Sequence, residues 1–299
     1  MAKYDAMGDR VRRRIPVGVW IMLLGVVVGV VGLIWCLNTD LKKYSKSENL
    51  YTDQNIEDVK NLDFEFDSAD TVITRSSDRQ IHVTIENAAE GVYSYGQKDG
   101  TFYIHRKKKF SVIKWTGMSK IPFLKDIYPQ AKITIELPSV VFDEVEIENG
   151  AGDLKISSID CDKLKIDNGI GELELLECTA EKAEIENGIG ELDMNGCVFK
   201  HTELKNGIGE MNAKDCVFKG DTGIDSGIGE VTMTAKFKGD VDLESGIGEV
   251  TLNIDGDGSD YRITGDTDDI KIKGRSGSSG AEYKIKVDKG IGDITINFI

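Results

Sequence analysis

The chain repeats one seven-residue motif, which reads ENGAGDL at 148–154, DNGIGEL at 167–173, ENGIGEL at 186–192, KNGIGEM at 205–211, DSGIGEV at 225–231, ESGIGEV at 244–250 and DKGIGDI at 288–294. The first glycines of the first six copies follow one another at intervals of 19, 19, 19, 20 and 19 residues. A degraded copy around Gly265 keeps the interval of 19, and the loop 274–280 then lengthens the last interval to 25. A fixed short period indicates a protein built from stacked repeats.

Pairs of aliphatic residues alternate with polar ones on both sides of each motif, such as Val145/Ile147 before it and Leu154/Ile156 after it. Such alternation is typical of strands with one buried face. Helical repeats are excluded, because they run to 33 residues or more and these repeats are dense in glycine. We therefore predict an all-β fold over 148–299. It is a single-stranded parallel β-solenoid (β-helix) of about 19-residue coils, in which equivalent residues lie ~4.8 Å apart.

The paired glycines of the motif predict a corner in each coil, because glycine adopts a positive φ or tight curvature without a clash at Cβ. The residue between them is isoleucine in most copies, and we expect this β-branched side chain to fill the core at the bend. Tandem copies without crossover helices do not fit a dinucleotide-binding loop. The predicted corner glycines are Gly150, Gly152, Gly169, Gly171, Gly188, Gly190, Gly207, Gly209, Gly227, Gly229, Gly246 and Gly248.

In the alternation of the strand, the residue before each first glycine points to the same side as the aliphatic residues that precede it, which is the interior. In four copies it is asparagine, namely Asn149, Asn168, Asn187 and Asn206, and Ser226, Ser245 and Thr264 follow in the later coils. Amide side chains stacked one coil apart can hydrogen-bond along the axis, so we predict a structural asparagine ladder. Cys178, Cys197 and Cys216 also repeat at 19 residues and should stack inside the coils as small apolar groups.

An acidic residue follows the second glycine of every copy, from Asp153 in the first to Asp293 in the last. If these carboxylates stack ~4.8 Å apart, each neighbouring pair repels by roughly 0.9 kcal/mol even at the dielectric constant of water. We expect them to splay into solvent. Calcium binding is an alternative, because the loops 255–260 and 266–269 add further carboxylates and Ca²⁺ prefers several oxygen ligands. The sequence indicates no other metal or cofactor.

Residues 15–37 carry no formal charge and are long enough to cross a bilayer as one helix. Arg10 and Arg12–Arg14 precede this segment, so the tail 1–14 should stay in the cytoplasm and the rest should be exported. A cleaved signal peptide is the competing interpretation, but it needs a shorter apolar core and a small-residue cleavage site. Gly25 and Gly29 could form a helix dimerisation face, which leaves self-association open.

The tandem N-G-I-G-E-L coils behind one N-terminal anchor resemble the bacterial putative-adhesin family of β-helical domains, including LiaG-like membrane-anchored proteins of Gram-positive envelope-stress operons. The resemblance covers roughly residues 59–299, and its specificity lies in the repeats of 148–250 and 288–294. It implies an exported β-helical domain and supplies no catalytic residues. The stretch 100–135 departs from the repeat.

We divide the exported part into a polar stalk at 38–58, irregular N-terminal coils at 59–147 and the regular solenoid at 148–299. The N-terminal coils contain a basic-aromatic insertion at 105–125, with seven Lys or Arg and no acidic residue. This insertion suits an anionic partner such as lipid headgroups or a wall polymer. The alternative is a solvated loop that caps the open end of the solenoid. The candidate contact residues are Arg106, Lys107, Lys108, Lys109, Lys114 and Trp115.

Composition excludes several classes of function. The 299 residues include 52 acidic and 37 basic side chains, a net charge of −15, which argues against a nucleic-acid binder. The three histidines share no repeat position, and no hydrolase, zinc-protease or nucleotide-binding motif occurs, so we expect no enzymatic activity. We predict a membrane-anchored adhesin or scaffold module on the outer face of a bacterial membrane, partnered by an envelope protein or wall polymer. The alternative is an accessory or sensor protein of an envelope-stress response.

Overall fold

A computed structural model describes residues 47–55, 59–107, 131–266 and 270–299 of the chain. They belong to one compact unit, Ser47–Ile299, and are all-β apart from one 3₁₀ turn at Gly258–Asp260. The tail at 1–14, the predicted anchor at 15–37 and the first part of the stalk lie outside the described residues. Within the described ranges, no helix has the length and apolar character that a membrane crossing requires.

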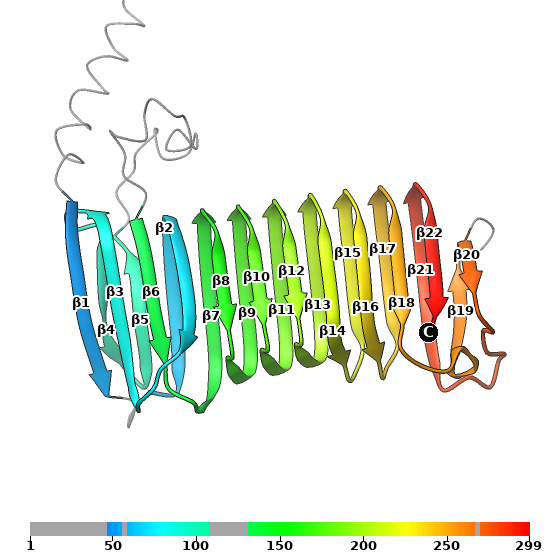
Figure 1. Ribbon diagram of the computed structural model, residues 1–299, viewed down its shortest axis with the longest axis horizontal. Helices are drawn as coiled ribbons and strands as arrows, with labels where there is room; N and C mark the ends of the chain where they lie inside the picture. The colour runs from blue at the N-terminus through cyan, green and yellow to red at the C-terminus, as the bar shows by residue number, and fades with distance from the viewer. Residues whose placement is uncertain (1–46, 56–58, 108–130, 267–269) are drawn as a thin grey trace, which may run out of the picture. The chain divides into compact units, whose positions relative to one another are not determined.

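Two parallel ladders form the regular part of the unit (Figure 1). The first ladder contains β7 (Val141–Ala151), β9 (Asp160–Ile170), β11 (Thr179–Ile189), β13 (Val198–Ile208), β15 (Thr222–Ile228) and β17 (Val241–Ile247). The second contains β8 (Leu154–Ser157), β10 (Leu173–Leu176), β12 (Leu192–Asn195), β14 (Met211–Phe218), β16 (Val231–Phe237) and β18 (Val250–Ile254). Asn187 pairs in register with Asn168 on one side and Asn206 on the other, so one turn of chain advances by one coil. The predicted parallel β-solenoid is confirmed.

The core is a continuous column of apolar side chains between the ladders. Inward and outward residues alternate along each strand, as Val145, Ile147, Leu154 and Ile156 show, each no more than 1% exposed. Buried aromatic rings stack in the later coils, where the ring centroids of Phe218 and Phe237 lie 5.0 Å apart. Because identical positions stack, each coil buries its apolar residues only against its neighbours, which is the energetic basis of a solenoid.

The N-terminal end is less regular because it mixes parallel and antiparallel strands. β2 (Asn61–Arg75) continues both ladders beside β7 and β8, and β5 (Thr101–Arg106) and β6 (Ala131–Leu137) pair parallel with its two halves. β4 (Tyr93–Lys98) joins β5, and β3 (Gln80–Ala89) joins β6, both antiparallel. β5 and β6 pair with β2 on either side of Phe66 and Ser68, the two β2 residues that pair with Asn149 and Ala151 at the corner of β7.

Part of the predicted stalk belongs to this end of the sheet. Residues Ser47–Asn55 form β1, which pairs antiparallel with β3, so the stalk assignment over 38–58 is wrong for this stretch. The sequence hides the strand because, among its side chains that the structure describes, only Leu50 packs against the core. β1 is therefore held mainly by backbone pairing and by polar contacts to β3, not by a buried apolar face.

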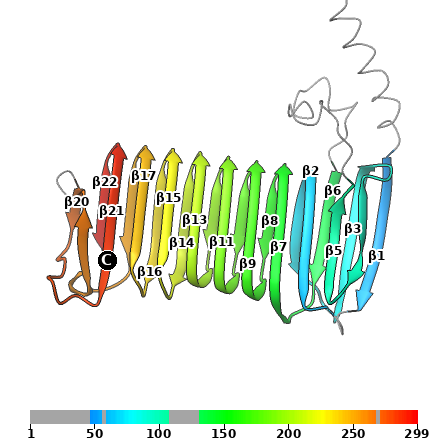
Figure 2. The ribbon, with the colours of Figure 1, turned by 180° about the vertical axis from the view of Figure 1, so that it is seen from behind.

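The C-terminal end departs from the chain order that the repeat predicts. β21 (Tyr283–Ile291) and β22 (Ile294–Phe298) stack directly on β17 and β18, and β19 (Tyr261–Gly265) and β20 (Ile270–Lys273) lie outside them. Figure 2 shows the same order from behind, with β20 at the end of the stack. The expectation that the degraded copy around Gly265 forms the next coil is wrong. Three of the four residues of β20 are exposed, whereas Ile285, Val287, Ile294 and Ile296 of the last copy fill the core.

Candidate functional site

The corners of the regular coils form one row along an edge of the solenoid, where β7, β9, β11, β13, β15 and β17 end and the chain turns into the second ladder (Figure 1). The second glycine of each corner has a positive φ, +143° at Gly190, and a β-carbon there would lie 2.0 Å from the carbonyl oxygen of Gly171. The first glycine is restricted by space alone, since a β-carbon at Gly188 would lie 2.5 Å from the carbonyl oxygen of Gly169. The glycines therefore let successive coils approach closely at the corner.

The other predicted corner glycines occupy the same two positions. Those with positive φ are Gly152, Gly171, Gly209, Gly229 and Gly248, and those limited by the preceding coil are Gly150, Gly169, Gly207, Gly227 and Gly246.

The asparagines before the corners form a buried hydrogen-bonded ladder. The Nδ2 of Asn149 donates to Oδ1 of Asn168 at 2.8 Å, Asn168 donates to Asn187 at 2.7 Å, and Asn187 donates to Asn206 at 2.9 Å. Asn149 and Asn168 also donate to the corner carbonyls of Gly152 and Gly171. The ladder is directional, so among the described residues Oδ1 of Asn149 and Nδ2 of Asn206 are left without a hydrogen bond at its two ends.

The residue between the two glycines points outward, which corrects the expectation that it fills the core. Ile170, Ile189, Ile208, Ile228, Ile247 and Ile291 stack in register along the corner row, and we call them the isoleucine file. They are between 43% and 71% exposed. The reversal has a geometric cause: the asparagine two positions earlier occupies the interior, and the tight corner carries the next side chain to the outside.

Carboxylates flank the isoleucine file on both sides. The first acidic file follows the second glycine and consists of Asp153, Glu172, Glu191, Glu210, Glu230, Glu249 and Asp293. The second acidic file precedes the asparagine position and consists of Glu148, Asp167, Glu186, Asp225, Glu244 and Asp288, with Lys205 in one coil. The pKa of Glu191 is raised, chiefly by the charge of Asp193, then by burial and by Glu210 and Glu172 of its own file. Like charges therefore remain close in the first acidic file.

Outside the corner row, acidic and basic side chains of neighbouring coils form ion pairs on the flat faces of the solenoid. Lys163 pairs with Glu144 at 2.6 Å, Lys200 pairs with Glu181 at 2.7 Å, and Lys165 pairs with Glu146. In the acidic files such pairs occur at Glu186 with Lys205 and at Asp293 with Lys271. The unbalanced negative charge of the described coils is thus greatest along the corner row. In the same part of the chain, no group of three or more His, Cys, Asp or Glu side chains is arranged to hold a metal ion.

The basic-aromatic insertion starts at the corner row but is only partly described. Arg106, the last residue of β5, forms an ion pair with Asp67. Lys107 is exposed, and its backbone N–H donates to the carbonyl of Val92. The remaining candidates for an anionic partner, Lys108, Lys109, Lys114 and Trp115, lie outside the described residues.

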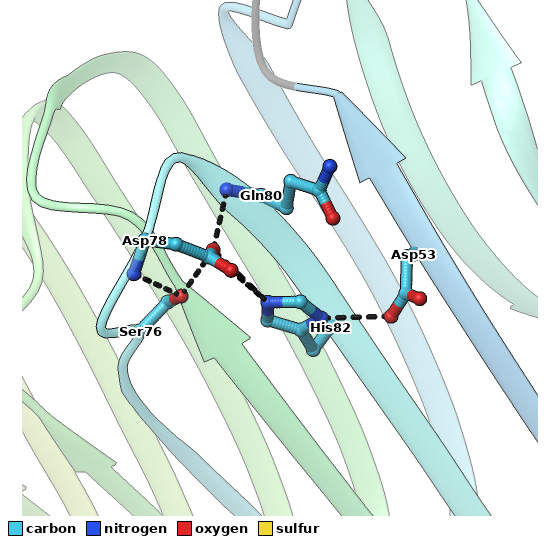
Figure 3. Close-up of polar contacts among 5 residues, drawn as sticks. All are labelled: Asp53, Ser76, Asp78, Gln80 and His82. Atoms are coloured by element: carbon cyan, nitrogen blue, oxygen red, sulfur yellow. Dashed lines mark hydrogen bonds and ion pairs between the residues drawn. The ribbon is translucent and has the colours of Figure 1, made fainter.

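A histidine cluster that the sequence interpretation missed lies at the N-terminal end (Figure 3). His82 of β3 contacts Asp53 of β1 at 2.7 Å through Nδ1 and Asp78 of the preceding turn at 3.0 Å through Nε2. Asp78 also accepts hydrogen bonds from Ser76 and from the backbone of Gln80. The hydrogen bonds of His82 itself, first the one to Asp53 and then the one to Asp78, raise the pKa of the imidazole. The one sequence signal was the spacing of Asp78 and His82 by four residues around a turn.

Four cysteines of the described residues contribute to the core. Cys161, Cys178, Cys197 and Cys216 are buried and free. Burial raises the pKa of the Cys161 thiol to about 12. The Cys161 thiol therefore stays protonated at neutral pH, which makes it a poor nucleophile and a poor metal ligand.

Comparison with known proteins gives a family and a fold. The family model described as Toastrack DUF4097 matches residues 59–297. A crystal structure titled as a putative adhesin from Bacteroides fragilis is similar at 15% identity and a TM-score of 0.53, covering 85% of this chain and 99% of that one. A crystal structure titled as a putative lipid binding protein from Parabacteroides distasonis has 16% identity and a TM-score of 0.42, covering 84% and 97%. No curated protein matches the chain.

Proposed function

Since the chain belongs to the Toastrack DUF4097 family, we propose that it is a non-enzymatic, adhesin-like binding or scaffold module of the bacterial cell envelope. The observation that carries the proposal is the solenoid itself. Its interior is filled with apolar side chains, while its outer residues form files that repeat along the edge and the faces. A repeating exterior suits recognition of an extended partner, as the elongated surfaces of other solenoids do.

Anchorage on the outer face of the cytoplasmic membrane is part of the proposal. Its support is the uncharged segment 15–37, which follows the arginines at 10 and 12–14 in the sequence. The positive-inside rule places these arginines in the cytoplasm. Fusions of alkaline phosphatase and of green fluorescent protein to the C-terminus of the full chain test this topology. We expect the phosphatase fusion to be active and the fluorescent fusion to be dark. The opposite pattern would contradict export of the solenoid.

Binding is tested with the full chain in native membranes. Photocrosslinkers placed at outward positions of the solenoid should capture a surface protein or a wall polymer if the protein is an adhesin or scaffold. Capture of one defined membrane regulator would instead favour the accessory or sensor role. Turnover in a screen against acidic and neutral glycans would overturn the non-enzymatic assignment.

A further inference from the structure

The isoleucine file is not required by the backbone of the corner. In the coils nearest the N-terminal end, the same corner position carries Ser68 in β2 and Ala151 in β7, and the chain turns there as well. Ala151 pairs in register with Ile170, the first member of the file. The fold therefore accepts a small or polar residue at this position, so six exposed isoleucines in succession need another explanation.

The file presents a narrow, linear apolar surface. Five intervals of ~4.8 Å separate its six members, which gives a length of about 24 Å. Side chains that are roughly half exposed leave on the order of 500 Å² of apolar area in one strip, near the upper end for monomeric proteins and in the range that is often functional.

Charge determines which partner fits this strip. In the six coils of the isoleucine file, six carboxylates follow the isoleucines, and five carboxylates with Lys205 precede them. A second copy of the corner row would bring like charges face to face, and an anionic bilayer would meet the same repulsion. A partner with an apolar centre and basic flanks would instead complement all three files.

From this charge pattern we propose that the isoleucine file and the two acidic files bind a cationic amphipathic helix. Apolar residues three and four apart on such a helix rise by 4.5 and 6 Å, which brackets the ~4.8 Å spacing of the isoleucines. In an extended peptide, residues on one side are about 6.6 Å apart and lose register with the file. A helix of about 16 residues spans the strip. This inference rests on the proposed function and specifies its partner class.

The test uses the full chain in phosphatidylcholine nanodiscs and a fluorescent 16-residue peptide with a leucine face flanked by lysines. We expect saturable binding that weakens steeply as salt rises, because exposed charges attract the peptide. A peptide of the same composition in scrambled order and an analogue with glutamate for lysine should bind at least about tenfold more weakly. Empty nanodiscs measure partitioning of the peptide into lipid.

Two variants locate the site. Ile189→Ser/Ile208→Ser/Ile228→Ser should weaken binding about tenfold or more. We expect this variant to fold, because Ser68 already occupies the equivalent corner position in β2. Glu191→Gln/Glu210→Gln/Glu230→Gln keeps the apolar strip and should weaken binding while flattening the salt dependence. The matched control is Val141→Ser, which removes an apolar side chain that is 67% exposed but lies at the opposite end of β7. Retained binding in either triple variant, with a native circular dichroism spectrum, would overturn the proposal.

A benzophenone at the centre of the leucine face keeps the test decisive if the isoleucine variant misfolds. Crosslinks to the wild-type chain should fall on the coil corners between 170 and 247. Crosslinks on the flat faces, association of two chains through the corner row, or occupation of the row by residues 108–130 of the chain itself would each contradict it. If envelope capture by the wild-type protein persists while peptide binding fails, only this inference is lost and the proposed function stands.

Discussion

Each corner places two glycines where a β-carbon has no room. At Gly190 both restrictions coincide, because φ is +143° and an added β-carbon would lie 2.0 Å from a backbone oxygen that cannot move away. We expect Gly190→Ala to lower the free energy of unfolding by about 2–4 kcal/mol. Gly223→Ala is the control, since a β-carbon there meets nothing closer than 3.9 Å. Equal loss of stability in both variants, measured by chemical denaturation, would refute the steric account.

The asparagine ladder ends where the sequence changes from asparagine to serine. Nδ2 of Asn206 is buried without a hydrogen bond, and Ser226 is its register partner in the next coil. Ser226→Asn would supply an Oδ1 acceptor at the ladder spacing, and its own Nδ2 would have the carbonyl of Gly229 as acceptor, as Asn149 has that of Gly152. We therefore expect a gain of about 1 kcal/mol in the free energy of unfolding. A second change, Asn187→Ala, removes the donor to Oδ1 of Asn206 and one of the two acceptors of Asn168, which keeps its bond to the carbonyl of Gly171, and should cost about 1–3 kcal/mol. A stabilising effect of Asn187→Ala would show that the ladder is not a source of stability.

The residue scale is also where sequence reasoning was most and least successful. Periodicity located the corner glycines and the inward asparagines, because both follow from alternation and from a repeated length. Alternation gave no guide to the isoleucine file, since a tight corner breaks the period of two that assigns side chains to faces. Because isoleucine usually lies in the interior, we predicted a core position for the isoleucine between the corner glycines. The asparagine two residues earlier occupies that part of the interior.

At the scale of elements, the first strand depends on polar contacts more than on apolar burial. β1 is joined to β3 by backbone pairing and by His82, which lies between Asp53 and Asp78. Such a strand carries little apolar periodicity, so the sequence indicated a stalk there. The sequence also did not reveal that β21 and β22 stack on β17 and β18 ahead of β19 and β20. A repeated motif shows that a copy can form a coil, but it does not show which copy stacks next.

The histidine predicts a pH dependence for the docking of β1. The pKa of His82 is raised in the folded state, so its charged form stabilises this contact fully below the unfolded pKa of about 6.5. That stabilisation is lost as pH rises through the folded pKa. We expect hydrogen exchange in 47–55, corrected for its intrinsic pH dependence, to quicken relative to β9 as the pH rises above about 6.5. His82→Gln should remove this change, and an unaltered pH profile in that variant would exclude the histidine as its cause.

At the scale of the whole molecule, stability is a sum over coils and over the contacts between them. The deletion of residues 179–197 tests this directly, because it removes one 19-residue period and joins Cys178 to Val198 as Cys197 is joined now. β9 and β10 can then stack on β13 and β14 with all files in register. We expect the shortened chain to fold cooperatively, with a native strand spectrum and a slightly smaller denaturant m-value, since less surface is exposed on unfolding.

Deletion of residues 179–193 is the matched control for that prediction. It removes 15 residues, four fewer than one period, so every residue that follows lies four positions out of register with the neighbouring coil. Phe199 and Leu204 then fall on the outward positions that Glu203 and Ile208 occupy now. We expect this chain to lose its cooperative transition although it retains more of the sequence. If both deletions fold equally well, register between coils is not what holds the solenoid together, and the alignment of the isoleucine and acidic files along the corner row loses its physical basis.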